Sequence, residues 1–320
     1  MKIINWGIIG TGNIANSFAT DFTYSEGGKL IAVASRSIEN AIKFAQKFKI
    51  KNIYGSYEEL YNDPEVDVVY IATPHNLHFK NVSDAIKKGK AVLCEKPITI
   101  NPEECHQLID LCRSTNTYLM EAMWTYFLPP ILKAREWIAE NRIGDVRYMR
   151  ADFGFKAEFK QQGRLFNPDL AGGALLDIGI YPIALAWLIY NQVPEQITVN
   201  LKRASTGVDT EEIMVFKYKD GSMANLTASL LYKMPNDAII IGDQGYIKIP
   251  DFFMANECFL YNNDDEVIEH YLDQRKSKGY NYEINAVNQN LLSGKKQSDV
   301  IPLSTSIKLQ EIMAMVYQKF

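Results

Sequence analysis

Three groups of residues with chemical potential lie far apart in this 320-residue chain. The first is the run Gly10-Thr11-Gly12-Asn13-Ile14-Ala15, which has the pattern G-x-G-x-x-A. Its first glycine permits a tight turn, its second lets the backbone approach a pyrophosphate, and Ala15 is small enough for a helix to pack on a strand. The run predicts a dinucleotide site at Gly10, Thr11, Gly12, Asn13 and Ile14, with a purely structural turn as the alternative.

The second group follows the next apolar segment and selects the cofactor. An NAD enzyme usually carries Asp or Glu there for the ribose 2′-hydroxyl, whereas this chain carries Ser35-Arg36-Ser37. A guanidinium can pair with a 2′-phosphate and two hydroxyls add donors, so we expect NADP, with NAD less favoured. The alternative for Arg36 is a solvated surface charge.

The third group could move a proton. Lys96 follows a predicted strand at the edge where open α/β sheets bind ligands, so it could stabilise a developing alkoxide. Asp177 and Tyr181 lie four residues apart in a helical pattern and therefore share a face. A phenol and a carboxylate together suit general acid–base catalysis, but a surface lysine, a helix-internal aspartate and a packing tyrosine are the structural alternatives.

The elements around these residues predict an α/β chain. Up to about residue 122, short apolar strands (3–9, 30–35, 66–72, 91–95, 118–121) alternate with helical patterns (14–22, 38–48, 57–61, 78–88, 102–113), which indicates a doubly wound parallel sheet. After helix 129–140, period-two strands near 146, 197–201, 213–218, 224–230, 238–241, 246–249, 257–261 and 267–271 indicate a large antiparallel sheet. Helices are expected over 173–190, 281–293 and 304–318. We therefore expect a Rossmann domain over 1–122 and an α+β domain over 123–320, whose last helix could pack on the first domain.

Composition excludes several classes of protein. Apolar residues are 47% and charged residues 22%, as in ordinary globular chains, and 34 basic against 38 acidic residues give a net charge of −4. Without a Lys/Arg cluster, no nucleic-acid partner is expected. No run was found to approach the roughly 18 apolar residues of a membrane span, and no signal peptide is visible, so we expect a cytoplasmic protein with no membrane partner.

The cysteines and histidines do not suggest a metal site. Cys94, Cys105, Cys112 and Cys258 form no Cys-x-x-Cys pair and are expected to be reduced and buried. His75 and His78 lack a third ligand nearby, so we expect no metal there. We expect these two histidines to line the cofactor or substrate site, and a structural role is the alternative.

Taken in order, the motifs resemble one known family. Gly10-Thr11-Gly12, Ala72-Thr73-Pro74-His75-Asn76-Leu77-His78, Glu95-Lys96-Pro97 and Gly172-Gly173-Ala174-Leu175-Leu176-Asp177, followed by Tyr181-Pro182, are similar to the glucose–fructose oxidoreductase/inositol dehydrogenase/MocA family. The Asp-x-x-x-Tyr element resembles its branch of dimeric dihydrodiol dehydrogenases and NADP-dependent D-xylose 1-dehydrogenases. One departure is Tyr126, where relatives often carry Arg.

The resemblance implies an NADP-dependent oxidoreductase that moves a hydride between nicotinamide C4 and a carbinol carbon of a sugar, polyol or vicinal diol. It implies catalytic roles for Lys96, Tyr181 and Asp177, with Lys96 and Tyr181 handling the proton, and a cis Lys96–Pro97 bond. Further implied cofactor residues are Thr73, Pro74, His75, His78, Glu95, Lys96, Pro97 and Trp124. Expected substrate contacts are Lys96, Trp124, Phe155, Arg164, Asp177 and Tyr181, with Phe153 a weaker candidate.

Two further expectations follow from the resemblance. The open sheet of the second domain is expected to form a homodimer or a higher homo-oligomer. The alternative function is a non-catalytic NADP-binding sensor on the same fold, and a metal-dependent hydrolase is disfavoured because no ligand set is present.

Overall fold

The structure is a computed structural model that describes residues 2–320 and divides into two compact units. Unit 1 comprises residues 1–124 and 276–307, and unit 2 comprises residues 125–275 and 308–320. The chain thus returns to unit 1 after building most of unit 2. The expected boundary near residue 122 remains a prediction.

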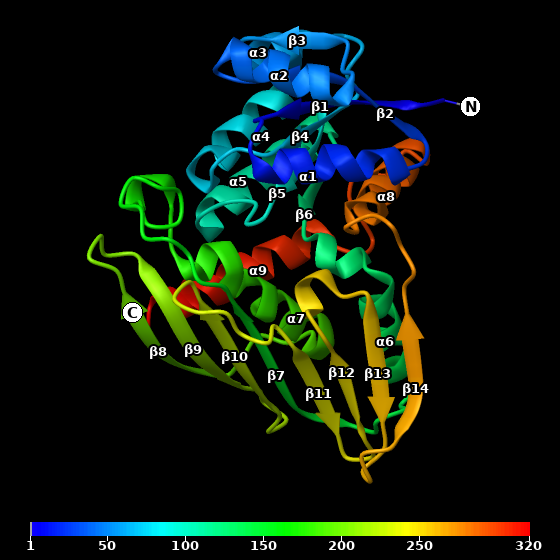
Figure 1. Ribbon diagram of the computed structural model, residues 1–320, viewed down its shortest axis with the longest axis vertical. Helices are drawn as coiled ribbons and strands as arrows, with labels where there is room; N and C mark the ends of the chain where they lie inside the picture. The colour runs from blue at the N-terminus through cyan, green and yellow to red at the C-terminus, as the bar shows by residue number, and fades with distance from the viewer. Residues whose placement is uncertain (1) are drawn as a thin grey trace. The chain divides into compact units, whose positions relative to one another are not determined.

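Unit 1 contains a six-stranded parallel sheet in the order β3-β2-β1-β4-β5-β6, which is the strand order of a dinucleotide-binding fold (Figure 1). Its strands are β1 (Ile4–Ile9), β2 (Gly28–Ala34), β3 (Asn52–Tyr54), β4 (Val68–Ile71), β5 (Ala91–Glu95) and β6 (Leu119–Ala122). Its helices are α1 (Asn13–Asp21), α2 (Ile38–Phe48), α3 (Tyr57–Asn62), α4 (His78–Lys87), α5 (Pro102–Thr115) and α8 (Tyr280–Leu292). The predicted strands and helices are therefore present, and β3 is an additional edge strand.

Local sequence explains where the helices of unit 1 begin and end. Asn101 caps α5 by accepting a hydrogen bond from the Glu104 N–H at 2.8 Å, and Pro102 occupies the first helical position. Gly89 follows α4 with φ +74°, so it provides the left-handed stop expected of a glycine there.

Unit 2 contains an eight-stranded, mostly antiparallel sheet in the order β14-β13-β12-β11-β7-β10-β9-β8, in which only β7 and β10 pair in parallel. Its strands are β7 (Val146–Gly154), β8 (Gln196–Arg203), β9 (Asp209–Lys217), β10 (Met223–Ser229), β11 (Ala238–Gly242), β12 (Tyr246–Ile249), β13 (Glu257–Tyr261) and β14 (Val267–Leu272). Its helices are α6 (Pro129–Ala139) and α7 (Ile180–Tyr190), preceded by a π-helical turn, η5 (Leu175–Gly179). Helix α9 (Leu303–Tyr317) begins in unit 1 and ends in unit 2.

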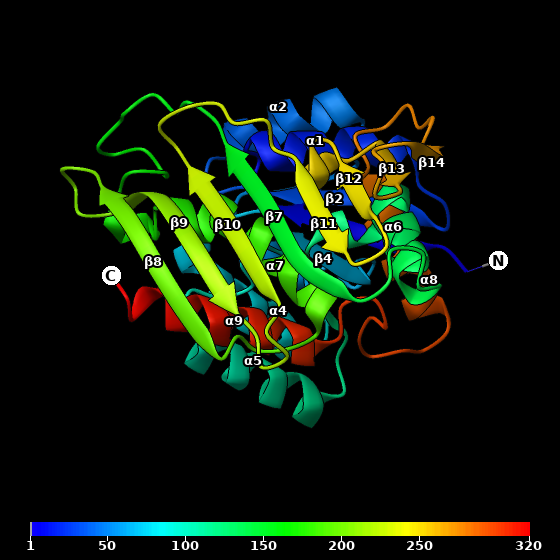
Figure 2. The ribbon, with the colours of Figure 1, turned by 90° about the horizontal axis from the view of Figure 1, so that it is seen from below.

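Figure 2 looks onto the face of this sheet that α6 and α7 leave uncovered. Met223, Tyr148 and Ile241 are aligned across β10, β7 and β11 and therefore point to the same face. Met223 and Ile241 are exposed, whereas their neighbours Ala224, Met149 and Ile240 are buried on the opposite face. The sheet thus shows the alternation that its sequence predicted, with one face buried and one open.

The expectation that no segment has the length and apolarity of a membrane span was wrong. Pro168–Tyr190 meets both criteria, but 78% of its most apolar window is buried inside the protein. This property fits a core helix, because the same residues supply the centre of unit 2.

All four cysteines are buried and unbonded to one another, as expected. Burial raises the pKa of Cys112 and of Cys258 to about 12, and holds that of Cys94 well above its usual range. None of these three thiols is therefore a ready nucleophile at neutral pH.

Candidate functional site

The glycine turn after β1 leaves space for a ligand at one position and none at the other. Gly10 has φ +90°, and a Cβ there would lie 2.6 Å from the Ala72 carbonyl oxygen at the end of β4. A Cβ on Gly12 would meet nothing within 4 Å. Gly12 caps α1 without a side-chain hydrogen bond, and the first turn of α1 has no acidic residue. Open space at an uncapped helix N-terminus fits a pyrophosphate.

The segment after β2 contains the three predicted cofactor residues Ser35, Arg36 and Ser37. The two serines make local contacts, whereas Arg36 faces a cavity. Ser37 caps α2, because its hydroxyl accepts the Asn40 N–H at 3.3 Å. The Ser35 hydroxyl oxygen lies 3.4 Å from the Ser37 N–H. Arg36 lies beside Tyr57, a neighbour that the sequence did not reveal. Burial raises the pKa of the Tyr57 hydroxyl, and the positive charge of Arg36 counteracts part of that rise.

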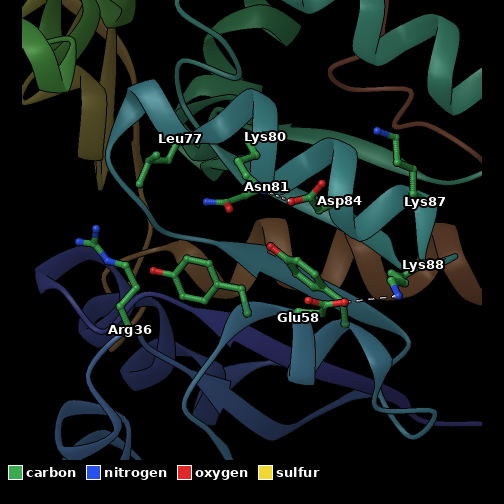
Figure 3. A pocket seen from close by; sticks show the side chains of 10 residues that line it. Arg36, Glu58, Leu77, Lys80, Asn81, Asp84, Lys87 and Lys88 are labelled. Atoms are coloured by element: carbon green, nitrogen blue, oxygen red, sulfur yellow. Dashed lines mark hydrogen bonds and ion pairs between the residues drawn. The ribbon is translucent and has the colours of Figure 1, made fainter.

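Arg36 also lines a cavity of about 530 Å³ between α3 and α4. Figure 3 shows Arg36 opposite Lys80 and Asn81 of α4 and opposite Leu77, which directly precedes α4. Lys87 and Lys88 add positive charge, which Glu58 and Asp84 partly balance. The Arg36 end of the cavity is therefore suited to a phosphate group.

The loop after β4 is fastened to the loop after β5 by one histidine. The ring nitrogens of fully buried His78 lie 2.7 Å from the Pro97 carbonyl oxygen and 2.8 Å from that of Thr73. Thr73 also accepts a hydrogen bond from Asn81 at 3.0 Å. The His75 ring packs edge-on against His78 at 5.7 Å. These contacts favour the structural role for His78, because both of its ring nitrogens already face carbonyl oxygens of the protein. Together, His78, Asn81 and Thr73 hold the backbone around Pro74 in place.

Lys96 lies directly after β5, and the Lys96–Pro97 bond is cis, which confirms that expectation. Lys96 is 8% exposed. Its neighbour Glu95 accepts a hydrogen bond from the buried Tyr70 hydroxyl. Glu121, from β6, accepts the Ile98 N–H at 2.9 Å, and burial raises the pKa of its carboxyl to about 7. Lys96 therefore lies near a buried carboxyl, that of Glu121, whose pKa is raised to about 7.

Two residues of α8 join this region, and the sequence did not mark them as part of the site. The Trp124 ring stacks on Tyr280 with centroids 4.4 Å apart. Glu283 is fully buried, and burial followed by the nearby Glu95 carboxyl holds its pKa well above the usual range. No local pattern indicates these roles, because α8 is about 160 residues after Trp124 in the chain.

In unit 2, Asp177 lies in the π-helical turn η5 and Tyr181 lies in the first turn of α7. The Asp177 carboxylate accepts hydrogen bonds from both terminal nitrogens of Arg164, at 2.6 and 3.5 Å. The Asp177 side chain is 9% exposed and that of Arg164 is 52% exposed, so the pair has one buried and one solvated partner. The structure thus brings together Arg164 and Asp177, two of the residues expected to contact the substrate.

An aromatic wall borders Tyr181. The Phe153 and Phe253 rings stack with centroids 3.9 Å apart, and both meet the Tyr181 ring edge-on, at 5.4 and 5.9 Å. Phe155 continues the wall, 6.4 Å from Phe153. Phe253 was not predicted, because it lies in a short loop helix that no periodicity marks.

Tyr126 has a structural contact at the position where relatives often carry Arg. It is 1% exposed, and its hydroxyl donates to the Ala184 carbonyl oxygen in α7 at 2.6 Å. Residues 2–320 contain no group of three or more His, Cys, Asp or Glu side chains placed to hold a metal ion.

Comparison with known proteins agrees with this layout. Residues 4–123 match the model of an oxidoreductase family with an NAD-binding Rossmann fold, and residues 131–248 match the GFO/IDH/MocA C-terminal domain. Trans-1,2-dihydrobenzene-1,2-diol dehydrogenase of Mus musculus is 37% identical over 97% of this chain and 95% of its own. The Homo sapiens enzyme is 35% identical over 98% and 96%.

Solved structures share the fold at lower identity. A 3-ketoreductase from Actinomadura kijaniata, solved with NADP and TDP-benzene, has a TM-score of 0.87 at 24% identity and covers 99% of this chain and 98% of its own. Aldose-aldose oxidoreductase from Caulobacter crescentus has a TM-score of 0.89 at 21% identity, covering 99% and 97%. Together with the near-full-length relatives, these findings show that the chain is an oxidoreductase with a nicotinamide-cofactor fold and belongs to the Gfo/Idh/MocA family.

Proposed function

We propose that this chain is an NADP-dependent dehydrogenase that acts on a ring-shaped vicinal diol or sugar. The observation that carries the substrate class lies in unit 2. There the aromatic wall of Phe153, Phe253 and Tyr181 adjoins the Asp177–Arg164 pair. A ring stacks on aromatic faces, and adjacent hydroxyls suit a carboxylate acceptor, so a cyclic diol satisfies both parts better than a linear polyol. The dihydrodiol dehydrogenase relatives support this class.

The cofactor preference rests on Arg36. Its guanidinium, beside Tyr57 in the lining of a cavity that also contains lysines, suits a 2′-phosphate, and no acid occupies positions 35–37. The open space at Gly12 would receive the pyrophosphate. When bound, the nicotinamide supplies a hydride acceptor or donor at its C4 atom.

The chain's own residues handle the proton. In the oxidation direction, the phenolic oxygen of Tyr181 accepts the proton of the substrate hydroxyl, and in reduction it returns that proton. The Lys96 ammonium stabilises the negative charge that develops on the same substrate oxygen, while Asp177 accepts a hydrogen bond from the neighbouring hydroxyl. The buried surroundings of Lys96 strengthen this electrostatic effect.

A substrate panel at fixed NADP tests the proposal. Cyclic trans-diols and pyranoses are expected to turn over faster than linear polyols, and Lys96→Ala and Tyr181→Phe are each expected to lower kcat/KM about 100-fold or more. The proposal fails if both variants keep most of their activity. NADP binding without oxidation of any panel member would instead support the sensor function.

We also propose that the open sheet face of unit 2 joins two or more copies. Ile213, Met223 and Ile241 are exposed on three strands of this face. An uncovered, partly apolar sheet face fits a self-complementary contact. Met223→Lys with Ile241→Lys should reduce the mass measured by light scattering to that of one chain, whereas a monomeric wild type would overturn the proposal.

We propose a cytoplasmic location, because the four cysteines are reduced and buried and therefore suit a reducing compartment. Cell fractionation is expected to recover the protein in the cytosol, and recovery with membranes or outside the cell would contradict this proposal.

A further inference from the structure

The helical segment that carries Asp177 and Tyr181 begins at two glycines with no space for a side chain. A Cβ on Gly172 would lie 2.8–2.9 Å from the carbonyl oxygens of Arg164, Leu165 and Asn167. Gly173 has φ +128°, and its Cβ would lie 2.4 Å from a carboxylate oxygen of Asp209. The close approach of Asp209 therefore requires glycine at position 173.

Asp209 is the first residue of β9 and is 3% exposed. Its second carboxylate oxygen accepts the backbone N–H of Leu175, the first residue of η5, at 2.6 Å. An internal carboxylate thus caps the turn that contains Asp177, which is two residues further along. A shift of this cap would move Asp177 directly and Tyr181 through the same helix.

Glu212, three residues after Asp209, is fully buried. No nitrogen or hydroxyl donor among the described residues reaches either of its carboxyl oxygens. The Asp209 carboxyl lies beside it and, after burial, is the largest cause that raises the pKa of Glu212. Two carboxyl groups this close can share a hydrogen bond only if one of them carries a proton.

We propose that Asp209 and Glu212 form a proton-sharing pair that positions Asp177 and Tyr181 for the reaction. In this arrangement Glu212 donates its proton to Asp209, and Asp209 directs its other oxygen to the Leu175 N–H. Both are positioning residues, because neither is placed against substrate or cofactor. The inference rests on the proposed dehydrogenase function.

The charges around the pair do not stabilise a second negative charge. The nearest acidic neighbour, Glu211, is paired with Lys202 of β8 at 2.7 Å, so that lysine is already engaged. Burial first, and then the Asp209 carboxyl, hold the pKa of Glu212 well above its usual range. Glu211 of β9 and Tyr317 of α9 interact electrostatically with the pair, and the β10 neighbour Ser229 is neutral. Arg203 of β8, which lies near Tyr317, donates to the Gly207 carbonyl oxygen at 2.9 Å.

Loss of the shared proton would place two carboxylates together and weaken the cap on Leu175. We therefore expect kcat for the diol to fall as the pH rises through the titration of the pair. The KM for NADP should stay within about twofold, because the predicted cofactor residues do not include this pair.

The experiment compares Glu212→Gln with the wild type and with a matched control, Glu211→Gln. The amide that Glu212→Gln introduces can donate to Asp209 at any pH, so this variant should keep kcat within about twofold at neutral pH and lose the alkaline decline that the pair causes. Glu211→Gln removes a neighbouring carboxyl that pairs with Lys202 rather than Asp209, and it should retain the decline. An identical alkaline decline in wild type and Glu212→Gln would overturn the inference.

A second variant and a second measurement keep the test independent of turnover. Asp209→Ala, which leaves the Leu175 N–H without its acceptor, should lower kcat about tenfold or more, with the KM for NADP unchanged. The protection factors of the amides at residues 175–179, which correct for the intrinsic rise of hydrogen exchange with pH, should fall in Asp209→Ala and, at alkaline pH, in wild type but not in Glu212→Gln. If no substrate turns over, the proposed function fails while the exchange data still decide on the pair. Unchanged protection in Asp209→Ala, or protection in Glu212→Gln that falls with pH as in wild type, would reject the positioning role.

Discussion

The two glycine turns of the molecule, Gly10–Gly12 in unit 1 and Gly172–Gly173 in unit 2, begin helical segments in opposite ways. At Gly12 the space beside the backbone is open, and the first turn of α1 contains no acidic residue. At Gly173 that space is filled by the Asp209 carboxylate, which also accepts the Leu175 N–H. The N-terminus of α1 can therefore accept an anionic ligand, whereas the N-terminus of η5 is already capped by the Asp209 carboxylate.

This difference separates binding from positioning. A vacant helix N-terminus has affinity for a phosphate because its N–H groups lack partners. A helix start already capped by a buried carboxylate gains no ligand but holds its side chains in fixed places. Similar glycine signals in a sequence can therefore serve two different purposes.

The largest expected effect distinguishes the two glycines of the first turn. Gly10→Ala forces a Cβ against the Ala72 carbonyl at a left-handed φ, and neither backbone can yield. We expect the free energy of unfolding to fall by more than about 3 kcal/mol, measured by denaturant titration.

Gly12→Ala is the matched control, because a methyl group there meets nothing. Its stability should change by about 1 kcal/mol or less, while the affinity for NADP falls about 10–100-fold because the methyl group occupies the space for the phosphate. Equal losses of stability in both variants would contradict the difference between these positions.

In the second turn, Gly173→Ala should destabilise the protein by about 3 kcal/mol, since its Cβ meets Asp209. The double variant Gly173→Ala with Asp209→Ala should be more stable than the sum of the single effects predicts, because removing the carboxylate relieves the clash. Thermal or denaturant unfolding of all four proteins gives the coupling energy. Strict additivity would show that the two residues do not interact.

The buried acid beside Lys96 predicts a pH dependence of stability. The pKa of Glu121 is raised from 4.5 to about 7 in the folded protein, so between these values the folded chain keeps a proton that the unfolded chain has released. Stability therefore falls as the pH rises from about 4.5 to 7, and then levels off. Glu121→Gln should remove this slope and gain up to about 3 kcal/mol relative to wild type over the interval. Parallel stability profiles for the two proteins would contradict the assigned burial effect.

The smallest expected effect concerns the cofactor side. Tyr57→Phe removes the hydroxyl beside the Arg36 guanidinium, and should weaken NADP binding about 2–5-fold without changing NAD binding. Calorimetry on both cofactors measures this. Tyr54→Phe is the control, because the Tyr54 hydroxyl donates to Asp63 at 2.8 Å and not to Arg36. An equal loss of NADP affinity in Tyr54→Phe would show that Tyr57 has no specific effect on Arg36.

Much of the layout could be predicted from local pattern alone. The bounds of α2, β5, β12 and β13 coincide with the predicted ones, because each element has a clear periodicity between turn residues. The strand β3 was missed because it has only three half-buried residues at the sheet edge. The helix expected from Gly173 to Tyr190 begins instead with a π turn, where Asp209, 34 residues later than Leu175, binds its backbone.

The supporting residues of the site could not be predicted in the same way. Asp209-Thr210-Glu211-Glu212 has the composition of a solvated run, yet all four residues are 5% exposed or less. Their burial depends on the helical segment and on β8 and β10, none of which is near in sequence. Glu283 and Tyr280 likewise reach unit 1 only because the chain returns there after β14.

The burial of every cysteine has a practical consequence for spectroscopy. Cys94, Cys105, Cys112 and Cys258 are hidden from reagents in the folded protein, so a cysteine introduced at an exposed position would react with a spin label or a fluorophore almost alone. One such position in each unit, for example Lys51 and Lys219, would provide a pair of probes on the native background. The separation of the probes, measured with and without cofactor, would test whether the cofactor changes the distance between these two positions.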